Sequence, residues 1–210
     1  MKKFLARLLA LAALVAAPAA HAITLNGEIR NIDGDNDGFA DDLLIQRISF
    51  DVTAGTSLFF DSLVWEATGV DLNGDGELTG FDNYMMLLTA GGSYLTANDD
   101  SGATYGDGSV HPYDSTIGYT FGTAGTYVIT LGQLAYSTSE AMQGYQANRN
   151  YYDYNGNNLD HGDWRLTISV NSGSISNLSY SNSNSVPDTA TVGAMLGAAI
   201  LGLAAFKRRR

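Results

Sequence analysis

The residues best suited to bind a cation form an acidic run between positions 71 and 82. Oxygen-bearing side chains occupy loop positions 1, 3 and 5, a glycine suited to a sharp turn occupies position 6, and an acid occupies position 12. Calcium takes six to eight oxygen ligands. The spacing predicts a calcium loop with six contributing residues: Asp71, Asn73, Asp75, Glu77 through its carbonyl, Thr79 (or a water in its place) and Asp82. The alternative is a solvated acidic turn that holds no ion.

A second acidic run starts in the same way at position 33 but has Leu44 at position 12. Its predicted ligands are the side chains at positions 1, 3 and 5, one carbonyl and one closing acid: Asp33, Asp35, Asp37, Phe39 and Asp41, with Asp42 as the alternative closing acid. This run is therefore a second, less complete candidate calcium site.

The two runs resemble known extracellular calcium loops. The 71–82 run is similar to the loop of dockerins, with aspartate at its end, and the 33–42 run resembles thrombospondin-type calcium repeats. Both resemblances imply calcium as the cofactor. No long helical pattern flanks the 71–82 run, so we expect it to be inserted between strands as a structural clip.

Aromatic and amide side chains gather between positions 145 and 164. Sugar rings stack on aromatic faces while amides bond their hydroxyl groups, so this composition indicates a glycan-binding surface. The candidate contacts are Tyr151, Tyr152, Tyr154 and Trp164. The alternative interpretation is a long loop whose aromatic side chains seal the edge of the fold.

No pattern of catalytic residues stands out. The sequence has neither H-E-x-x-H nor G-x-S-x-G, and His161 between Asp160 and Asp163 makes a serine triad only formally conceivable. Paired carboxylates for glycoside hydrolysis are recognised by their separation in space. We therefore expect a protein that is not an enzyme, with a secreted hydrolase as the weakest alternative.

Short runs rich in β-branched and aromatic residues must position these groups. Several alternate between apolar and polar residues, which is typical of strands with one solvated face. The predicted strands are residues 44–52, 57–65, 83–89, 93–97, 116–121, 126–131, 163–170 and 174–180. The sequence thus predicts an all-β domain over residues 23–180, an antiparallel β-sandwich or jelly roll without cysteines.

Part of this region resembles the bacterial pre-peptidase C-terminal domain, a small β-sandwich of secreted proteins. The resemblance covers residues 44–132 and rests on segments 50–56 and 119–127, which share an Ala-Gly turn between strands, and on 95–100. It implies a non-catalytic accessory fold that in some cases binds calcium.

The N-terminus predicts export. Lys2, Lys3 and Arg7 precede a short apolar run, and an A-x-A site ends at Ala22, so residues 1–22 read as a signal peptide cleaved after Ala22. The alternative is an uncleaved anchor. Removing the three cationic residues would lower the formal charge from -11 to about -14, which argues against nucleic acid as a partner.

The C-terminus predicts sorting. A Ser/Asn linker (residues 181–185) precedes an apolar segment at 191–206, a basic end at 207–210 and a short motif of five residues: Val186, Pro187, Asp188, Thr189 and Ala190. Residues 186–210 resemble the PEP-CTERM sorting signal, with Asp188 and Thr189 in place of the usual Glu and Pro. The resemblance implies a transmembrane helix and an exosortase-type partner.

Together these features predict a destination and a role. We expect the body to lie outside the inner membrane before processing and then at the cell surface or outside the cell. The leading hypothesis is a calcium-stabilised structural or adhesive protein of the surface or matrix. The alternative is a module that binds carbohydrate, such as exopolysaccharide.

Overall fold

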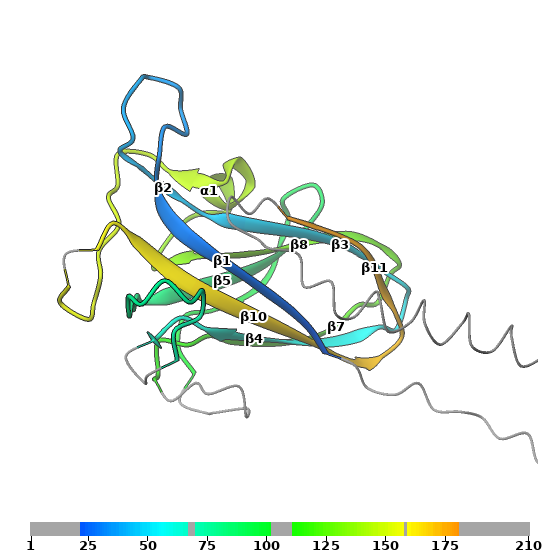
Figure 1. The fold of residues 1–210 in the computed structure, drawn as a ribbon. Helices are drawn as coiled ribbons and strands as arrows, with labels where there is room; N and C mark the ends of the chain where they lie inside the picture. Colours follow the sequence, from blue (N-terminus) through cyan, green and yellow to red (C-terminus); the bar gives the residue numbers. More distant parts are fainter. Residues whose placement is uncertain (1–21, 67–69, 102–110, 158, 181–210) are drawn as a thin grey trace, which may run out of the picture.

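The protein folds into two antiparallel β-sheets, shown in Figure 1. The computed structural model describes residues 22–66, 70–101, 111–157 and 159–180. The first sheet has strand order β7-β4-β10-β1-β2-β9. Its strands are β1 (Ala22–Ile32), β2 (Asp42–Leu44), β4 (Ser57–Leu63), β7 (Thr116–Thr120), β9 (Tyr145–Gln146) and β10 (His161–Ser172).

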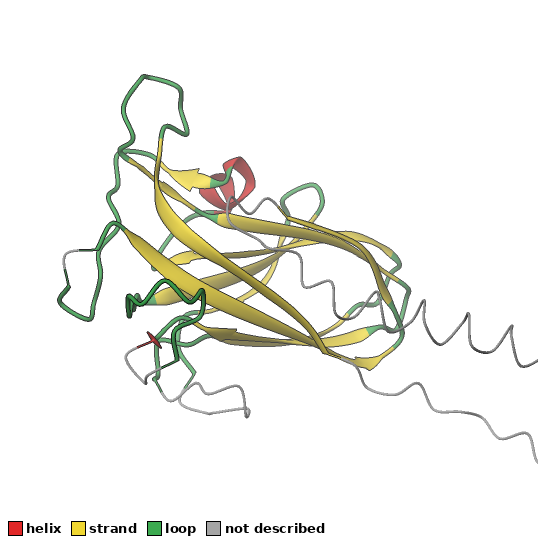
Figure 2. Ribbon diagram, viewed as in Figure 1, coloured by secondary structure: helices red, strands yellow, loops and turns green. Residues whose placement is uncertain are grey.

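The second sheet has strand order β11-β3-β8-β5-β6. Its strands are β3 (Gln46–Val52), β5 (Asn83–Thr89), β6 (Tyr94–Asn98), β8 (Gly125–Gln133) and β11 (Ile175–Tyr180). The single α-helix of the described residues is α1 (Thr138–Gln143), red in Figure 2, which begins with a capping box between Ser137 and Glu140. The prediction of an all-β antiparallel fold is confirmed.

The core lies between the two sheets and is built from alternate strand residues. In β3 the buried side chains Gln46, Ile48, Phe50 and Val52 alternate with more exposed ones, as the sequence pattern predicts. Phe50 of the second sheet packs against Phe60 of the first, with ring centroids 5.7 Å apart. Contacts of this kind across the sheets make the fold a β-sandwich.

Strand β1 lies inside the first sheet although the sequence analysis predicts no strand there. It pairs antiparallel with β10 from Ala22↔Ser169 to Arg30↔His161. Ile23, Leu25 and Ile29 alternate with polar residues, but Gly27 falls at the apolar position between Leu25 and Ile29 and weakens the strand pattern. Gly27 is nevertheless required, because a Cβ at this position would lie 2.4 Å from the indole of Trp164.

The predicted strand over residues 44–52 divides at Ile45. The backbone N–H of Ile45 donates to the carbonyl of Gly144, outside either ladder. The residues before it belong to β2 in the first sheet, and those after it form β3 in the second. The chain therefore crosses between sheets here, where the side chain of Ile45 packs against Tyr136 and Ala141.

The predicted signal peptide and sorting signal lie outside the described residues, apart from Ala22, which is the first residue of β1. Within the described part of the chain, no helix has the length and apolar character to cross a membrane.

Candidate metal sites in the two acidic loops

The 71–79 loop has its oxygen-bearing side chains held by its own backbone. Asp71 Oδ2 accepts a hydrogen bond from the N–H of Gly76 at 2.9 Å, Asn73 Oδ1 from Asp75 at 3.0 Å, and Asp75 Oδ1 from Glu77 at 2.7 Å. Gly76 has φ of 88°, which glycine adopts without strain. The loop's own backbone therefore orients these side-chain oxygens.

The 33–39 loop repeats the same scheme position by position. Asp33 Oδ2 accepts from Gly38 at 3.2 Å, Asp35 Oδ1 from Asp37 at 3.1 Å, and Asp37 Oδ1 from Phe39 at 2.9 Å. Gly38, at position 6 like Gly76, has φ of 97°. The two acidic runs thus form the same local structure.

A buried acid anchors each loop to the sandwich. Asp42, which has no exposed surface, accepts hydrogen bonds at 2.9 Å from the N–H groups of Gly34, Asp35 and Asn148. Burial alone would raise the pKa of Asp42, but these three donors hold that pKa below its ordinary value.

Glu66 anchors the 71–79 loop in the corresponding way. It is fully buried and accepts from the N–H of Leu72 at 2.5 Å, the N–H of Thr79 at 2.8 Å and the hydroxyl of Thr79 at 2.7 Å. The Thr79 oxygen in turn accepts from the N–H of Asp163 on β10 at 2.9 Å. Glu66 therefore ties both ends of the loop to the first sheet.

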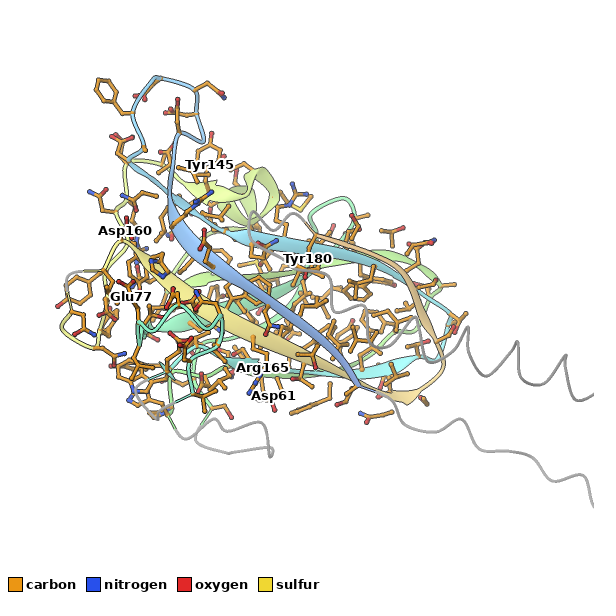
Figure 3. The ribbon with its side chains drawn as sticks, in the orientation of Figure 1. Asp61, Glu77, Tyr145, Asp160, Arg165 and Tyr180 are labelled. Atoms are coloured by element: carbon orange, nitrogen blue, oxygen red, sulfur yellow. The ribbon has the colours of Figure 1, made fainter. Side chains whose placement is uncertain are left out.

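The start of β10 adds side chains to the 71–79 loop. His161 Nε2 lies 3.5 Å from Asp75 Oδ2, 3.8 Å from Glu77 Oε2 and 3.5 Å from Asp163 Oδ2. Its Nδ1 lies 3.1 Å from the carboxylate of Asp160. Glu77 and Asp160 mark the two sides of this group at one end of the molecule in Figure 3.

Asp163 is the most constrained acid of this group. It is 1% exposed, and its Oδ2 has no hydrogen-bond partner. Burial, and then the charge of Glu66, raise the pKa of Asp163 to about 7, although His161 opposes the shift. Burial alone would lower the pKa of His161, but the surrounding carboxylates raise it. The site therefore has an excess of negative charge.

The structure gathers some predicted ligands and separates others. In the described residues two groups of His, Asp and Glu have their ligand atoms within 4.8 Å of one another, namely Asp75, Glu77 and His161, and Asp33, Asp35 and Asp37. Neither group includes Asp41, which is half-buried, or Asp71, which the loop's backbone holds through Gly74 and Gly76. Asp163 is also outside both groups, although its Oδ2 lies 3.5 Å from His161 Nε2.

Asp82 lies apart from both groups. Burial, followed by the charges of Asp100 and Asp99, raises the pKa of Asp82 to about 6, and its Oδ1 is buried without a hydrogen-bond partner. Thr79, at position 9, is fully buried with its hydroxyl engaged by Glu66. Glu66 and His161 could not be assigned to this site from the sequence, because nothing local in the sequence connects them to the loop.

The predicted glycan contacts divide into buried and exposed residues. Trp164 is fully buried over Gly27, so its prediction as a glycan contact is wrong: the neighbouring glycine makes room for the indole inside the core. Tyr151 is half-buried and packs edge-on against Phe81 at 6.3 Å. For Tyr151 the alternative interpretation, a side chain that seals the edge of the sandwich, describes the structure, whereas Trp164 is a core residue of strand β10.

Tyr152 and Tyr154 are exposed, by 63% and 43%, with ring centroids 5.0 Å apart. Tyr154 contacts Tyr113 at 5.6 Å, and Tyr113 contacts Trp65 at 5.4 Å. His111 stacks on Trp65 at 3.9 Å. These five rings form a continuous aromatic row.

A cleft of about 740 Å³ opens beside His161. Charged and amide side chains from β1, from β10 and from the segment before β10 line it, including Glu28, Arg30, Asn31, Asn150 and Asp160. Glu28 is nearly buried and pairs with Arg30 at 3.2 Å. The cleft gives solutes a route to the imidazole.

Comparison with known proteins identifies no family. No family model matches the chain, and no curated protein matches it. Among solved structures the chain is similar to the periplasmic inhibitor of g-type lysozyme, PliG, from Aeromonas hydrophila, with a TM-score of 0.35 and 14% sequence identity over 73% of this chain and 90% of that one. A likeness of this extent carries no inference about function, which is therefore drawn from the loops themselves.

Proposed function

We propose that this protein is an exported structural or adhesive β-sandwich of the cell surface or extracellular matrix, stabilised by calcium in its 71–79 loop. The observation that carries the proposal is the preorganised set of oxygen atoms in that loop. Asp71, Asn73 and Asp75 are each oriented by backbone N–H groups, and Glu66 ties the loop to the sheet.

Calcium suits this donor set. Asp71, Asn73 and Asp75 supply side-chain oxygens, and the carbonyl of Glu77 supplies a fourth, while water completes the coordination. Because the loop's own hydrogen bonds orient these groups, they lower the entropic cost of binding the ion. The 33–39 loop has the same local scheme with three exposed carboxylates, and we assign it a weaker calcium site.

Export and sorting rest on the sequence of the two ends. The signal peptide supports export, and the tripartite end at 186–210 supports recognition by an exosortase-type enzyme. In the host, deletion of residues 207–210 is expected to move the protein from the cell surface to the membrane fraction or the medium. An unchanged distribution of the shortened chain would exclude this sorting route.

The calcium proposal is tested by thermal unfolding of the full chain with calcium and with EDTA. Calcium is expected to raise Tm in the wild type and to raise it far less in Asp71→Asn. The control is Asp51→Asn, because Asp51 lies on β3 and bonds Thr126 and Asn177, remote from both loops. A calcium shift that survives Asp71→Asn would refute the 71–79 site.

Glycan binding is a second candidate, favoured by the exposure of Tyr152 and Tyr154 at the end of the aromatic row. Exposed aromatic faces offer stacking to sugars, and the amide oxygens of Asn155 and Asn157, whose NH2 groups donate to the carbonyl of Leu78, offer hydrogen-bond acceptors. On an array that includes the host's exopolysaccharide, the double variant Tyr152→Ala, Tyr154→Ala is expected to lose binding. Tyr94→Ala, which removes an exposed tyrosine on β6, is the control. No hits, or equal loss in both variants, would refute this function.

A further inference from the structure

The geometry around His161 Nε2 differs from that of a hydrogen-bonded histidine. Three carboxylate oxygens surround this one nitrogen at 3.5, 3.5 and 3.8 Å. These separations exceed the 2.7–3.2 Å of a hydrogen bond. A tetrahedral ion with ligand bonds of about 2.0–2.1 Å would place its ligands about 3.3–3.4 Å apart. The distances from Nε2 to the three carboxylate oxygens are thus closer to those between neighbouring ligands of a small metal ion than to those of direct hydrogen bonds.

The other nitrogen of the ring determines what Nε2 can do. Nδ1 lies 3.1 Å from Asp160 Oδ1, and an ionised carboxylate only accepts, so Nδ1 carries a hydrogen. In the neutral ring Nε2 then presents a lone pair to three groups that are themselves acceptors. A cation between them removes this conflict. A carboxylate that orients a histidine through its far nitrogen is the usual support of a metal ligand.

Asp163 supplies an independent indication. Its side chain is 2% exposed, and its Oδ2 points at Nε2 of His161 without any hydrogen-bond partner. A buried carboxylate oxygen without a donor is costly unless a cation compensates it. The other acids near this pair are Glu66, engaged by Thr79, and Glu28, paired with Arg30.

We propose that one divalent transition-metal ion of the zinc type binds between the 71–79 loop and β10. Asp75, Glu77 and His161, whose ligand atoms lie within 4.8 Å of one another, hold it, and Asp163, whose Oδ2 faces His161 Nε2, moves toward the two loop acids to complete the site. An imidazole among carboxylates suits zinc, copper or nickel, whereas calcium takes oxygen ligands. The ion enters through the cleft beside His161. By joining the loop to β10, it fastens segments about eighty residues apart in the chain.

This site is chemically distinct from the calcium position of the proposed function, although the two share Asp75. The Oδ1 atom of Asp75 accepts a hydrogen bond from the N–H of Glu77, whereas its Oδ2 atom accepts from the side-chain amide of Asn73 and faces His161. One aspartate can thus serve both ions through different oxygens. Asp71 contributes only to the calcium position, so variants at Asp71 and His161 separate the two proposals.

The test uses the full chain, stripped with EDTA and titrated with Co²⁺ as a spectroscopic substitute and with Zn²⁺ against a chromogenic chelator. We expect the intense visible absorption of tetrahedral Co²⁺, displaced by one equivalent of Zn²⁺. His161→Gln should weaken zinc binding at least tenfold. His111→Gln should bind zinc like the wild type, because His111 stacks on Trp65 in the aromatic row. Asp71→Asn should also retain zinc binding while losing the calcium shift.

A second variant guards against loss of folding in His161→Gln. Asp163→Asn keeps the shape of the side chain and removes one buried charge. It should raise Tm in EDTA and abolish the additional Tm shift caused by Zn²⁺. Absence of the cobalt band, or a zinc shift that persists in Asp163→Asn, would overturn the proposal and leave His161 as a protonated ion-pair partner. Neither the absence of the cobalt band nor a persisting zinc shift would change the rise in Tm that calcium causes. Loss of that calcium-dependent rise alone would leave the proposed zinc site intact.

Discussion

The two acidic loops have the same local structure and different surroundings. In both loops the side chain at position 1 accepts a hydrogen bond from the backbone N–H of position 6, that at position 3 from position 5, and that at position 5 from position 7. In both, a buried carboxylate also accepts hydrogen bonds from backbone N–H groups and so ties the loop to the sandwich. The 33–39 loop extends away from the sheets at the top of Figure 1, with Asp33, Asp35 and Asp37 exposed. The 71–79 loop instead contacts β10. Local sequence therefore forms the loop, and the opposing strand determines its chemistry.

The surroundings also change the energetics. Exposed carboxylates in the 33–39 loop repel one another weakly because water screens them. The 71–79 loop adds the fully buried Glu66 and the nearly buried Asp163, whose charges are far less screened. The stability of the protein should therefore depend more on the 71–79 loop, both with and without metal.

The largest expected effect is on the anchor of the 71–79 loop. Glu66→Ala removes the acceptor for three hydrogen bonds and leaves buried donors unpaired, so it should lower the free energy of unfolding by about 2–4 kcal/mol. Urea unfolding in EDTA measures this. Asp33→Asn, in the exposed loop, is the comparison variant and should change stability little. Equal effects of the two variants would contradict the asymmetry between the loops.

Calcium should stabilise mainly through the 71–79 loop. At a calcium concentration about 100-fold above Kd, the gain is about 2.7 kcal/mol, or roughly 5–10 °C in Tm for a chain of this size. The double variant Asp33→Asn, Asp35→Asn should keep most of the shift, whereas Asp71→Asn should keep little. Scanning calorimetry distinguishes them. If the two variants lost equal parts of the shift, the loops would be equivalent sites.

Asp82 should make stability depend on pH independently of the loop. Its folded pKa of about 6 exceeds its ordinary value of 3.8. The folded state therefore favours the protonated form, and the resulting stabilisation is present below about pH 4 and lost as pH rises through 6. Asp82→Asn should flatten this part of the profile and raise stability at pH 7. Urea unfolding from pH 4 to 8 checks it, and an unchanged slope would contradict the assignment.

The smallest effect is expected at position 7 of the exposed loop. Phe39 is 67% exposed, and only its backbone takes part in the loop's hydrogen bonds. Phe39→Ser should therefore change the free energy of unfolding by less than about 0.5 kcal/mol and leave the calcium shift intact. A larger loss of stability in thermal or urea unfolding would show that the ring has a structural role.

Several elements could be predicted because their signals are local. Alternation in residues 46–52 predicts the buried face of β3, and the D-x-N-x-D-G spacing predicts the turn at Gly76. Strand β1 could not be predicted in this way, since Gly27 interrupts its pattern and has its place only because Trp164 packs on it. The same contact explains why an aromatic residue in a polar stretch is buried.

The sequence by itself determined the all-β class, most strands and the internal geometry of both acidic loops, because these depend on alternation, turn residues and hydrogen bonds between near neighbours. Only the tertiary structure decided that His161 meets both Asp75 and Asp163 while Asp82 lies near the charges of Asp99 and Asp100. Those contacts follow from where β10 and the 71–79 loop lie in the sandwich. Spacing along the chain carries no information about which distant strand a loop will contact.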